Sequence, residues 1–376
     1  MRGFDQNEYE SRTAKAQALM AQHDLGAMLL TSEPEIRYFT GFLTRFWESP
    51  SRPWFLVLPA TGAPIAVIPS IGAALMGQTW VRDIRTWRAP DLEDDGISLL
   101  IDTLSEVAGD GPVALHDGHE SHLRMPYADV QKLTAAVRVT SDHGIMRRLR
   151  MVKSAAEISK IRKACDIAGR AFARVPYIAQ EGVPLDQVFR RFQMLCLEEG
   201  ADWVPYLAGG AAQGGYEDVI SPARPVPLRQ GDVLMLDTGL VWDGYFCDFD
   251  RNWSVGTPSL AVSSGHARLI EAVDAGLEQC QPGRRACDVF AAMDAVVSDG
   301  TASDAGRLGH GLGMSLTEWP SLIAQDTTEL EVGMVLTLEP GVAIGSKIMV
   351  HEENILITSS GPEFLSPRHA AQISQL

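Results

Sequence analysis

VLMLDTGLVWDGYFCDFDRNWSVG, residues 233–256, has the composition of a single β-hairpin, in which apolar and aromatic residues form two arms around one turn. The turn is predicted at Asp243-Gly244, because both residue types tolerate the positive φ of a two-residue hairpin loop. With that turn, Asp237 on the first arm lies opposite Asp250 on the second, and Asp248 points to the same face as Asp250. The sequence therefore predicts three carboxylates on one side of the hairpin.

Three carboxylates on one face repel one another, and burial would raise their pKa values. A bound cation would remove the repulsion, and Gly239, expected opposite Asp248, would leave space between the carboxylates. The alternative is an acidic hairpin that faces solvent and binds nothing. Ligands elsewhere in the chain are needed to decide between the two.

The whole chain has the composition of an ordinary globular protein, and its 376 residues predict two domains. A formal net charge of −16 argues against nucleic acid or an anionic membrane as partners. The five cysteines lack CxxC spacing, and the N-terminus lacks the apolar core of a signal peptide. No apolar run is long enough to span a bilayer. We expect a soluble cytoplasmic protein without a membrane partner.

The domain boundary is predicted near residue 150, which divides the chain into 1–150 and 151–376. Ser154 and Glu157 form a capping box that begins a long amphipathic helix, expected to reach about residue 178. The region before it has an α/β pattern. Its strands are expected at 27–30, 36–42, 54–59, 64–69 and 112–116, and its helices at 7–23, 72–80, 95–109 and 122–137.

One loop of the first domain, 44–54, is rich in aromatic and basic residues, including Arg45 and Trp47. Three interpretations remain open for it: a subunit interface, a substrate lid, or a packed surface loop.

The second domain places further polar residues on otherwise apolar elements. His310 lies between glycines, where the backbone can approach another group closely. Glu339 ends an apolar strand, and Glu352 and Glu353 interrupt another. Together with the hairpin, they form an oxygen-rich set with one imidazole, which suits two divalent ions such as manganese, iron or cobalt, with zinc also open.

The order of these motifs resembles that of the creatinase/prolidase/methionine aminopeptidase family, the M24-type metallopeptidases. The segments 36–42 and 150–164 are also similar to the family's N-terminal domain and inter-domain helix. The motifs that carry the resemblance are Asp237-Thr-Gly239, Gly244-Tyr-Phe-Cys-Asp248, Gly309-His310-Gly-Leu-Gly313, Glu339-Pro-Gly341 and Glu352-Glu-Asn-Ile-Leu-Ile-Thr358.

The resemblance implies an α+β fold, with a pita-bread catalytic domain preceded by a smaller α/β creatinase-type domain. It also implies a hydrolase of amide or peptide bonds, similar to Xaa-Pro aminopeptidases and dipeptidases, with two metal ions, manganese favoured. The substrate would be a short peptide or another small molecule, and the protein a homodimer.

The implied metal ligands are Asp237, Asp248, His310, Glu339 and Glu352. Asp237 and Glu352 would bridge the ions, Asp248 would chelate one and His310 would bind the other, while Glu339 would also shuttle a proton. Glu353 replaces Glu352 in this set if the last motif is shifted by one residue.

This sequence departs from the family pattern at two histidines that hold the substrate in peptidase members. The first would stand at Thr317, which is followed by Glu318-Trp319-Pro320. The second would precede the hairpin, where no histidine occurs between His143 and His266. Thr317, or a residue of a partner's Arg45–Trp54 loop, is the candidate replacement, and Glu318 is a further candidate catalytic residue.

A third departure is Asp250, which stands where relatives carry threonine. Asp250 is therefore a candidate substrate contact.

Three other functions stay open. The Glu318-Trp319-Pro320 segment is similar to that of dimethylsulfoniopropionate lyases on this scaffold, although those carry an aspartate where this chain has Gly239. A betaine or amidino hydrolase is the second, because Tyr245, Trp319 and Trp47 could form an aromatic cage for a quaternary amine. The third is a family member that binds a partner without catalysis.

Overall fold

The computed structural model describes residues 2–49, 53–298 and 306–376 and divides into two compact units, Met1–Arg150 and Met151–Leu376. Positions 50–52 of the loop at 44–54 lie outside the described residues. Among the helices that can be described, none is long and apolar enough to cross a membrane.

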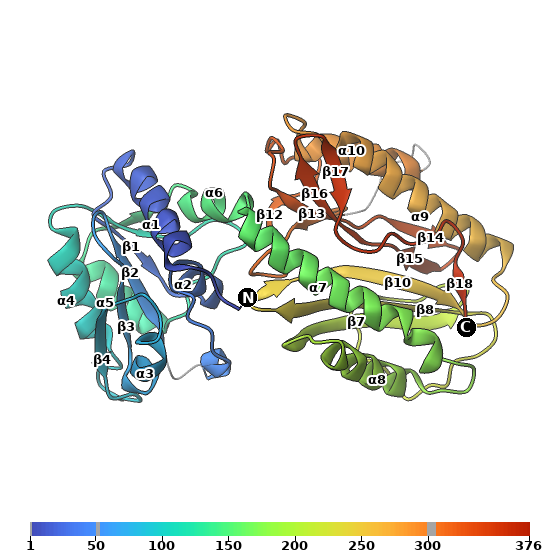
Figure 1. Cartoon of the computed structure of the whole chain (residues 1–376), viewed down its shortest axis with the longest axis horizontal. Helices are drawn as coiled ribbons and strands as arrows, with labels where there is room; N and C mark the ends of the chain where they lie inside the picture. The colour runs from blue at the N-terminus through green and yellow to red at the C-terminus, as the bar shows by residue number, and fades with distance from the viewer. Residues whose placement is uncertain (1, 50–52, 299–305) are drawn as a thin grey trace. The chain divides into compact units, whose positions relative to one another are not determined.

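The first unit contains one six-stranded sheet with helices packed against it (Figure 1). The strand order is β4-β3-β2-β1-β5-β6, with β1 antiparallel to β2 and parallel to β5. The strands are β1 Ala27–Leu30, β2 Phe55–Pro59, β3 Ile65–Pro69, β4 Asp83–Trp87, β5 Val113–Leu115 and β6 Val139–Ser141. The helices are α1 Gln6–Ala21, α2 Glu33–Thr40, α3 Ala73–Met76, α4 Ile97–Ala108, α5 Tyr127–Ala136 and α6 Ile145–Met151, with 3₁₀ turns η1 Phe46–Glu48 and η2 Ser70–Gly72.

The strand predicted at 36–42 is wrong, because residues 36–40 belong to helix α2, which ends before Gly41. Its aromatic and β-branched residues favour a strand, but stronger local signals surround them. Ser32 and Glu35 form a capping box, Pro34 occupies the first turn, and Gly41 ends the helix with a φ of 75°. Strands β4 and β6 were not predicted, and both are partly exposed rather than apolar throughout.

The second unit contains two five-stranded sheets and a two-stranded one (Figure 1). The sheet that we call the hairpin sheet has the order β18-β10-β8-β7, with β9 paired to β8. The sheet that we call the histidine sheet has the order β12-β11-β13-β16-β17, and β14 pairs with β15. Helices α7 and α8 contact β8 and β7, whereas α9 packs on α10 and on β14.

The strands of this unit are β7 Trp203–Gln213, β8 Asp232–Trp242, β9 Tyr245–Phe246, β10 Phe249–Ser254, β11 His310–Gly311, β12 Glu318–Ser321, β13 Val335–Leu338, β14 Gly341–Ile344, β15 Lys347–Val350, β16 Glu353–Thr358, β17 Gly361–Phe364 and β18 Ser374–Gln375. Its helices are α7 Ala155–Ala173, α8 Leu185–Glu198, α9 Leu260–Gln279 and α10 Ala286–Val297, with a 3₁₀ turn η3 at Val175–Tyr177.

The predicted hairpin is confirmed in its turn and in its register. Asp243 and Gly244 have φ values of 48° and 83°, as a tight turn of this type requires. Trp242 pairs with Tyr245 on either side of the turn. Asp237 pairs with Asp250 across β8 and β10, so their side chains share one face.

Candidate metal centre

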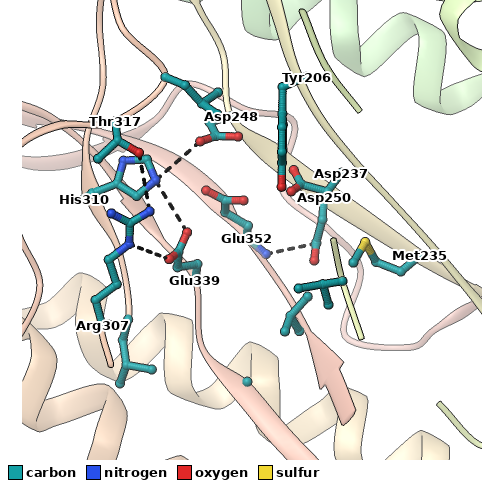
Figure 2. A pocket seen from close by; sticks show the side chains of 15 residues that line it. Tyr206, Met235, Asp237, Asp248, Asp250, Arg307, His310, Thr317, Glu339 and Glu352 are labelled. Atoms are coloured by element: carbon teal, nitrogen blue, oxygen red, sulfur yellow. Dashed lines mark hydrogen bonds and ion pairs between the residues drawn. The ribbon is translucent and has the colours of Figure 1, made fainter. Parts of the chain in front are cut away.

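A cavity of about 440 Å³ lies in the second unit, where residues of the hairpin sheet and the histidine sheet face each other (Figure 2). Its lining carries six carboxylate or imidazole side chains: Asp237, Asp248, Asp250, His310, Glu339 and Glu352. The three aspartates of the hairpin therefore project to the same side, as the sequence predicted. The remaining wall is mainly apolar.

The hairpin sheet supplies Asp237 and Asp248. Asp237 lies within β8, and Asp248 lies in the short break between β9 and β10. The side-chain amide of Asn354 forms hydrogen bonds with both backbone polar groups of Asp248. Asp248 N donates to Asn354 Oδ1 at 3.0 Å, and Asn354 Nδ2 donates to the Asp248 carbonyl. This pairing fixes Asp248 although it lies outside a regular strand.

The histidine sheet supplies His310, and the glycines beside it are required by close packing. A Cβ atom on Gly309 would lie 2.2 Å from the Thr337 carbonyl oxygen, and Gly309 has a φ of 143°. A Cβ on Gly311 would lie 2.1 Å from a backbone oxygen of Trp319. His310 Nδ1 lies 2.8 Å from the Gly311 carbonyl. That carbonyl can only accept, so Nδ1 carries the proton and the Nε2 lone pair faces the cavity.

Glu339 and Glu352 come from the same side of the cavity as His310. Glu339 directly follows β13, and its backbone N donates to the Leu308 carbonyl at 3.0 Å. Glu352 directly precedes β16 and is 5% exposed.

These side chains converge on a small volume. One donor atom each of Asp248, His310 and Glu352 lies within 4.8 Å of the other two. His310 Nε2 lies 3.4 Å from Asp248 Oδ2 and 3.6 Å from Glu339 Oε2. An imidazole with three carboxylates at this spacing is a suitable ligand set for a divalent ion.

Four buried carboxylate oxygens of cavity residues have no hydrogen-bond partner among the described residues: Asp237 Oδ1, Asp248 Oδ1, Asp250 Oδ2 and Glu352 Oε1. The other oxygen of Asp250 accepts hydrogen bonds, so we reserve the name unpaired acids for Asp237, Asp248 and Glu352. Burial raises the pKa of Asp237 and Glu352 well above the usual range, and the charges of neighbouring carboxylates raise both further. Burial likewise raises the pKa of Asp248 to about 6. Buried carboxylates without partners are costly, and divalent cations would satisfy them, so these residues fit a metal centre.

Two further cavity residues, Arg307 and Tyr206, were not predicted. Arg307 Nε lies 3.4 Å from Glu339 Oε1, and its Nη2 lies 3.4 Å from Thr317 Oγ1. A hydrogen bond from Tyr206 lowers the pKa of Asp237, which opposes the effect of burial. Arg307 stands only three residues before the candidate ligand His310, so its nearness to the site could have been predicted from the sequence. Tyr206 is brought in only by the pairing of β7 with β8.

The structure brings Thr317 and Asp250 to the cavity, whereas Glu318, Tyr245 and Trp319 make contacts elsewhere in the second unit. Glu318 is buried against Lys153, with its Oε2 3.1 Å from Lys153 Nζ, and it accepts a hydrogen bond from Ser315 N. The Tyr245 hydroxyl donates to Glu157 Oε1 at 2.9 Å, and Trp319 packs against the core beneath the histidine sheet. None of these three residues is among the described residues that line the cavity.

Arg45 and Trp47 belong to the first unit. Arg45 pairs with Glu48 at 3.6 Å, and Trp47 is largely buried against Trp54 and beneath Arg124. Within that unit, Trp47 is packed in the manner of a core side chain. Of the three residues considered for an aromatic cage, Tyr245 and Trp319 do not line the cavity.

The space expected beside Gly239 is filled. A Cβ atom there would lie 2.2 Å from Leu316 Cδ1 and 3.3 Å from Tyr206 Cβ. The Leu316 side chain therefore occupies the place where the lyase pattern has its extra aspartate.

Comparison with known proteins identifies the class. Residues 159–359 match the model of metallopeptidase family M24, and residues 12–152 match the creatinase/prolidase N-terminal domain. The chain therefore belongs to metallopeptidase family M24. This confirms the predicted family and its fold, a pita-bread catalytic domain that follows a creatinase-type domain.

Individual relatives match over nearly the full length. The probable dipeptidase PepE of Mycobacterium tuberculosis is 29% identical over 363 residues, which cover 95% of this chain and 94% of the relative. The crystal structure of dipeptidase PepE from Mycobacterium ulcerans superposes with a TM-score of 0.86 at 28% identity and covers 99% of both chains. A prolidase from Thermococcus sibiricus shares the fold, with a TM-score of 0.87 at 22% identity and coverage of 98% and 99%.

Proposed function

We propose that this protein is a metal-dependent peptidase that hydrolyses short peptides, with Xaa-Pro dipeptides as the first candidates. The observation that carries the proposal is the cluster of unpaired acids around His310 Nε2, in a chain of family M24. The dipeptidase and prolidase names of its relatives support the choice of substrate.

The proposed ligand set is the one expected from the sequence: Asp237, Asp248, His310, Glu339 and Glu352. Two divalent ions, with manganese favoured, match this oxygen-rich set with its single imidazole. Glu352 is preferred to Glu353, because Glu352 Oε1 lacks a partner whereas Glu353 pairs with Arg251.

Two bound ions would supply Lewis acidity, lowering the pKa of water from about 15.7 to about 7 and polarising the substrate carbonyl. The residues of the chain then orient the substrate and move the proton. Glu339 is the group that would accept the proton and deliver it to the leaving amine. Its carboxylate is partly exposed to the cavity and lies beside both His310 and Arg307.

Arg307 is proposed as the cationic group that binds a carbonyl or carboxylate oxygen of the substrate. Its guanidinium has five N–H donors, and the contacts at 3.4 Å to Glu339 and Thr317 hold it at the cavity wall. In this proposal Thr317 and Arg307 together take the place that relatives give to an imidazole.

A metal and substrate assay tests the proposal. The protein is purified without chelator, its metal content is measured by mass spectrometry, and hydrolysis of Xaa-Pro dipeptides is followed in Mn²⁺ buffer. We expect bound divalent metal and metal-dependent release of proline, with Glu339→Gln as the inactive control. A folded protein that binds no divalent ion and releases no amino acid from any dipeptide would overturn the proposal.

The homodimer and the cytoplasmic location remain predictions. Light scattering after size exclusion would test the first, and a mass of one chain would contradict it. Cell fractionation would test the second. The free cysteines are consistent with a reducing compartment.

A further inference from the structure

Asp250 and Arg251 lie next to each other on β10, and both reach the backbone of Glu352, a proposed metal ligand. Asp250 Oδ1 accepts a hydrogen bond from Glu352 N at 3.0 Å (Figure 2). Arg251 Nη1 donates to the Glu352 carbonyl at 3.2 Å. Both backbone polar groups of Glu352 are therefore held by side chains from β10.

These contacts run between two different sheets. Strand β10 belongs to the hairpin sheet, which carries Asp237 and Asp248, whereas Glu352 directly precedes β16 of the histidine sheet. The proposed ligand set is divided in the same way, with two ligands on the hairpin sheet side and three on the histidine sheet side. A shift of one sheet against the other would therefore change the distances within the ligand set.

Further side-chain contacts link β10 to the residues on either side of Glu352. The His351 ring donates from Nδ1 to Asp250 Oδ1 at 3.1 Å, and its Nε2 lies 3.2 Å from Glu353 Oε1. Glu353 Oε2 accepts from Arg251 Nη2 at 3.0 Å. We call Asp250, Arg251, His351 and Glu353 the paired network. All four are buried, Arg251 pairs with Glu353, and the His351 ring lies between the carboxylates of Asp250 and Glu353.

We propose that Asp250 is a positioning residue that, together with Arg251, holds the two halves of the ligand set at metal-binding distance by fixing the backbone of Glu352. This inference rests on the proposed metal centre. It predicts that Asp250 controls metal affinity without being a ligand.

A direct ligand role for Asp250 is the competing explanation, because its Oδ2 is buried, lacks a partner and lines the cavity. Two substitutions separate the roles. Asp250→Asn keeps an Oδ1 acceptor for Glu352 N but is a poor metal ligand. Asp250→Val removes the acceptor and leaves an apolar side chain in its place.

Mn²⁺ affinity is measured by titration calorimetry, and the magnetic coupling between two Mn²⁺ ions by electron paramagnetic resonance. For Asp250→Val, we expect the affinity for the less tightly bound Mn²⁺ ion to fall about 10- to 100-fold, which is the range seen when groups that orient metal ligands are removed. The magnetic coupling between the two ions should also decrease. Asp250→Asn should stay within about threefold of the wild type.

The matched control is Glu35→Gln in the first unit, which disrupts another buried carboxylate–histidine pair, Glu35 with His116. It should lower the melting temperature without changing Mn²⁺ affinity. The positioning role is overturned if Asp250→Val lowers only the melting temperature, or if both Asp250 variants lose affinity equally. A wild type that binds no Mn²⁺ would instead refute the metal centre itself, and this inference with it.

Discussion

Glu352 and Glu353 are neighbours in the chain, yet their carboxylates lie in opposite electrostatic surroundings. Burial and the charges of Asp248 and Asp237 raise the pKa of Glu352 well above its usual range. Burial would raise the pKa of Glu353 too, but Arg251 and His351 outweigh it and lower this pKa to about 2. Glu352 belongs to the unpaired acids, and Glu353 to the paired network.

The difference shows how buried charge separates a ligand site from a structural element. Within the paired network, the Glu353 carboxylate has both Arg251 and His351 beside it. The unpaired acids cannot all remain ionised next to one another without a cation. Burial alone does not make the distinction, because Glu352 is 5% exposed and Glu353 is 1% exposed.

The largest effect is expected from Glu352→Gln, which removes a proposed ligand and keeps its shape. Peptidase activity should fall by about 1,000-fold or more, because several kcal/mol of transition-state stabilisation are lost with the ions. Steady-state kinetics on an Xaa-Pro dipeptide measures it. Activity within tenfold of the wild type would remove Glu352 from the ligand set.

Glu353→Gln should act on stability instead. It leaves Arg251 buried without its carboxylate partner, and the loss of one member of a buried ion pair costs about 3 kcal/mol or more. Denaturant unfolding of the metal-free protein measures the change. Glu352→Gln is the control, expected to cost nothing there, because it removes a charge that has no partner. Equal losses of unfolding free energy for the two variants would show that Glu352 and Glu353 do not differ in this way.

The comparison also makes clear what the sequence could predict. The hairpin and the Asp237–Asp250 register followed from a local turn, Asp243-Gly244, and from the two-residue period of strands. The positions of the candidate ligands followed from motif order. In contrast, nothing local distinguishes Glu352 from Glu353, since the partner that separates them, Arg251, is about 100 residues away on another sheet.

The same limit applies to Glu318. It follows Thr317 directly but pairs with Lys153, which is 165 positions earlier in the chain. Helix α2 is the opposite case: its capping signals are local, but the aromatic and β-branched residues within it favour a strand.

A pH titration extends the comparison to His266, which is fully buried beside the paired network. Burial lowers the pKa of His266 to about 4, and the nearby His369 and His351 lower it further, while the Ala370 carbonyl and Asp250 act in the opposite direction. The folded pKa is below the unfolded value of about 6.5. This contribution to stability is therefore complete above about pH 6.5 and is lost as the pH falls toward 4.

Between pH 7 and pH 5 the loss from His266 is about 2 kcal/mol. Unfolding of the metal-free protein at both pH values measures it, with His266→Gln as the variant that lacks the titrating ring. We expect the variant to be less stable at pH 7 but to lose about 2 kcal/mol less on acidification than the wild type. Parallel losses in the two proteins would exclude His266 as the source.

The smallest effect is expected from Arg307→Lys, which keeps the positive charge but replaces the planar guanidinium group with an ammonium group. The value of kcat/KM should fall about tenfold, mainly through KM, because one ammonium cannot reproduce the guanidinium contacts. Metal content should not change. An unchanged kcat/KM would show that Arg307 serves only to hold Glu339 and Thr317.

Anomalous diffraction from crystals grown with Mn²⁺ tests the central claim most directly. Two manganese peaks should appear within the ligand set Asp237, Asp248, His310, Glu339 and Glu352, and no peak should lie against Glu353. A peak at the paired network, or none among the unpaired acids at saturating Mn²⁺, would contradict the account.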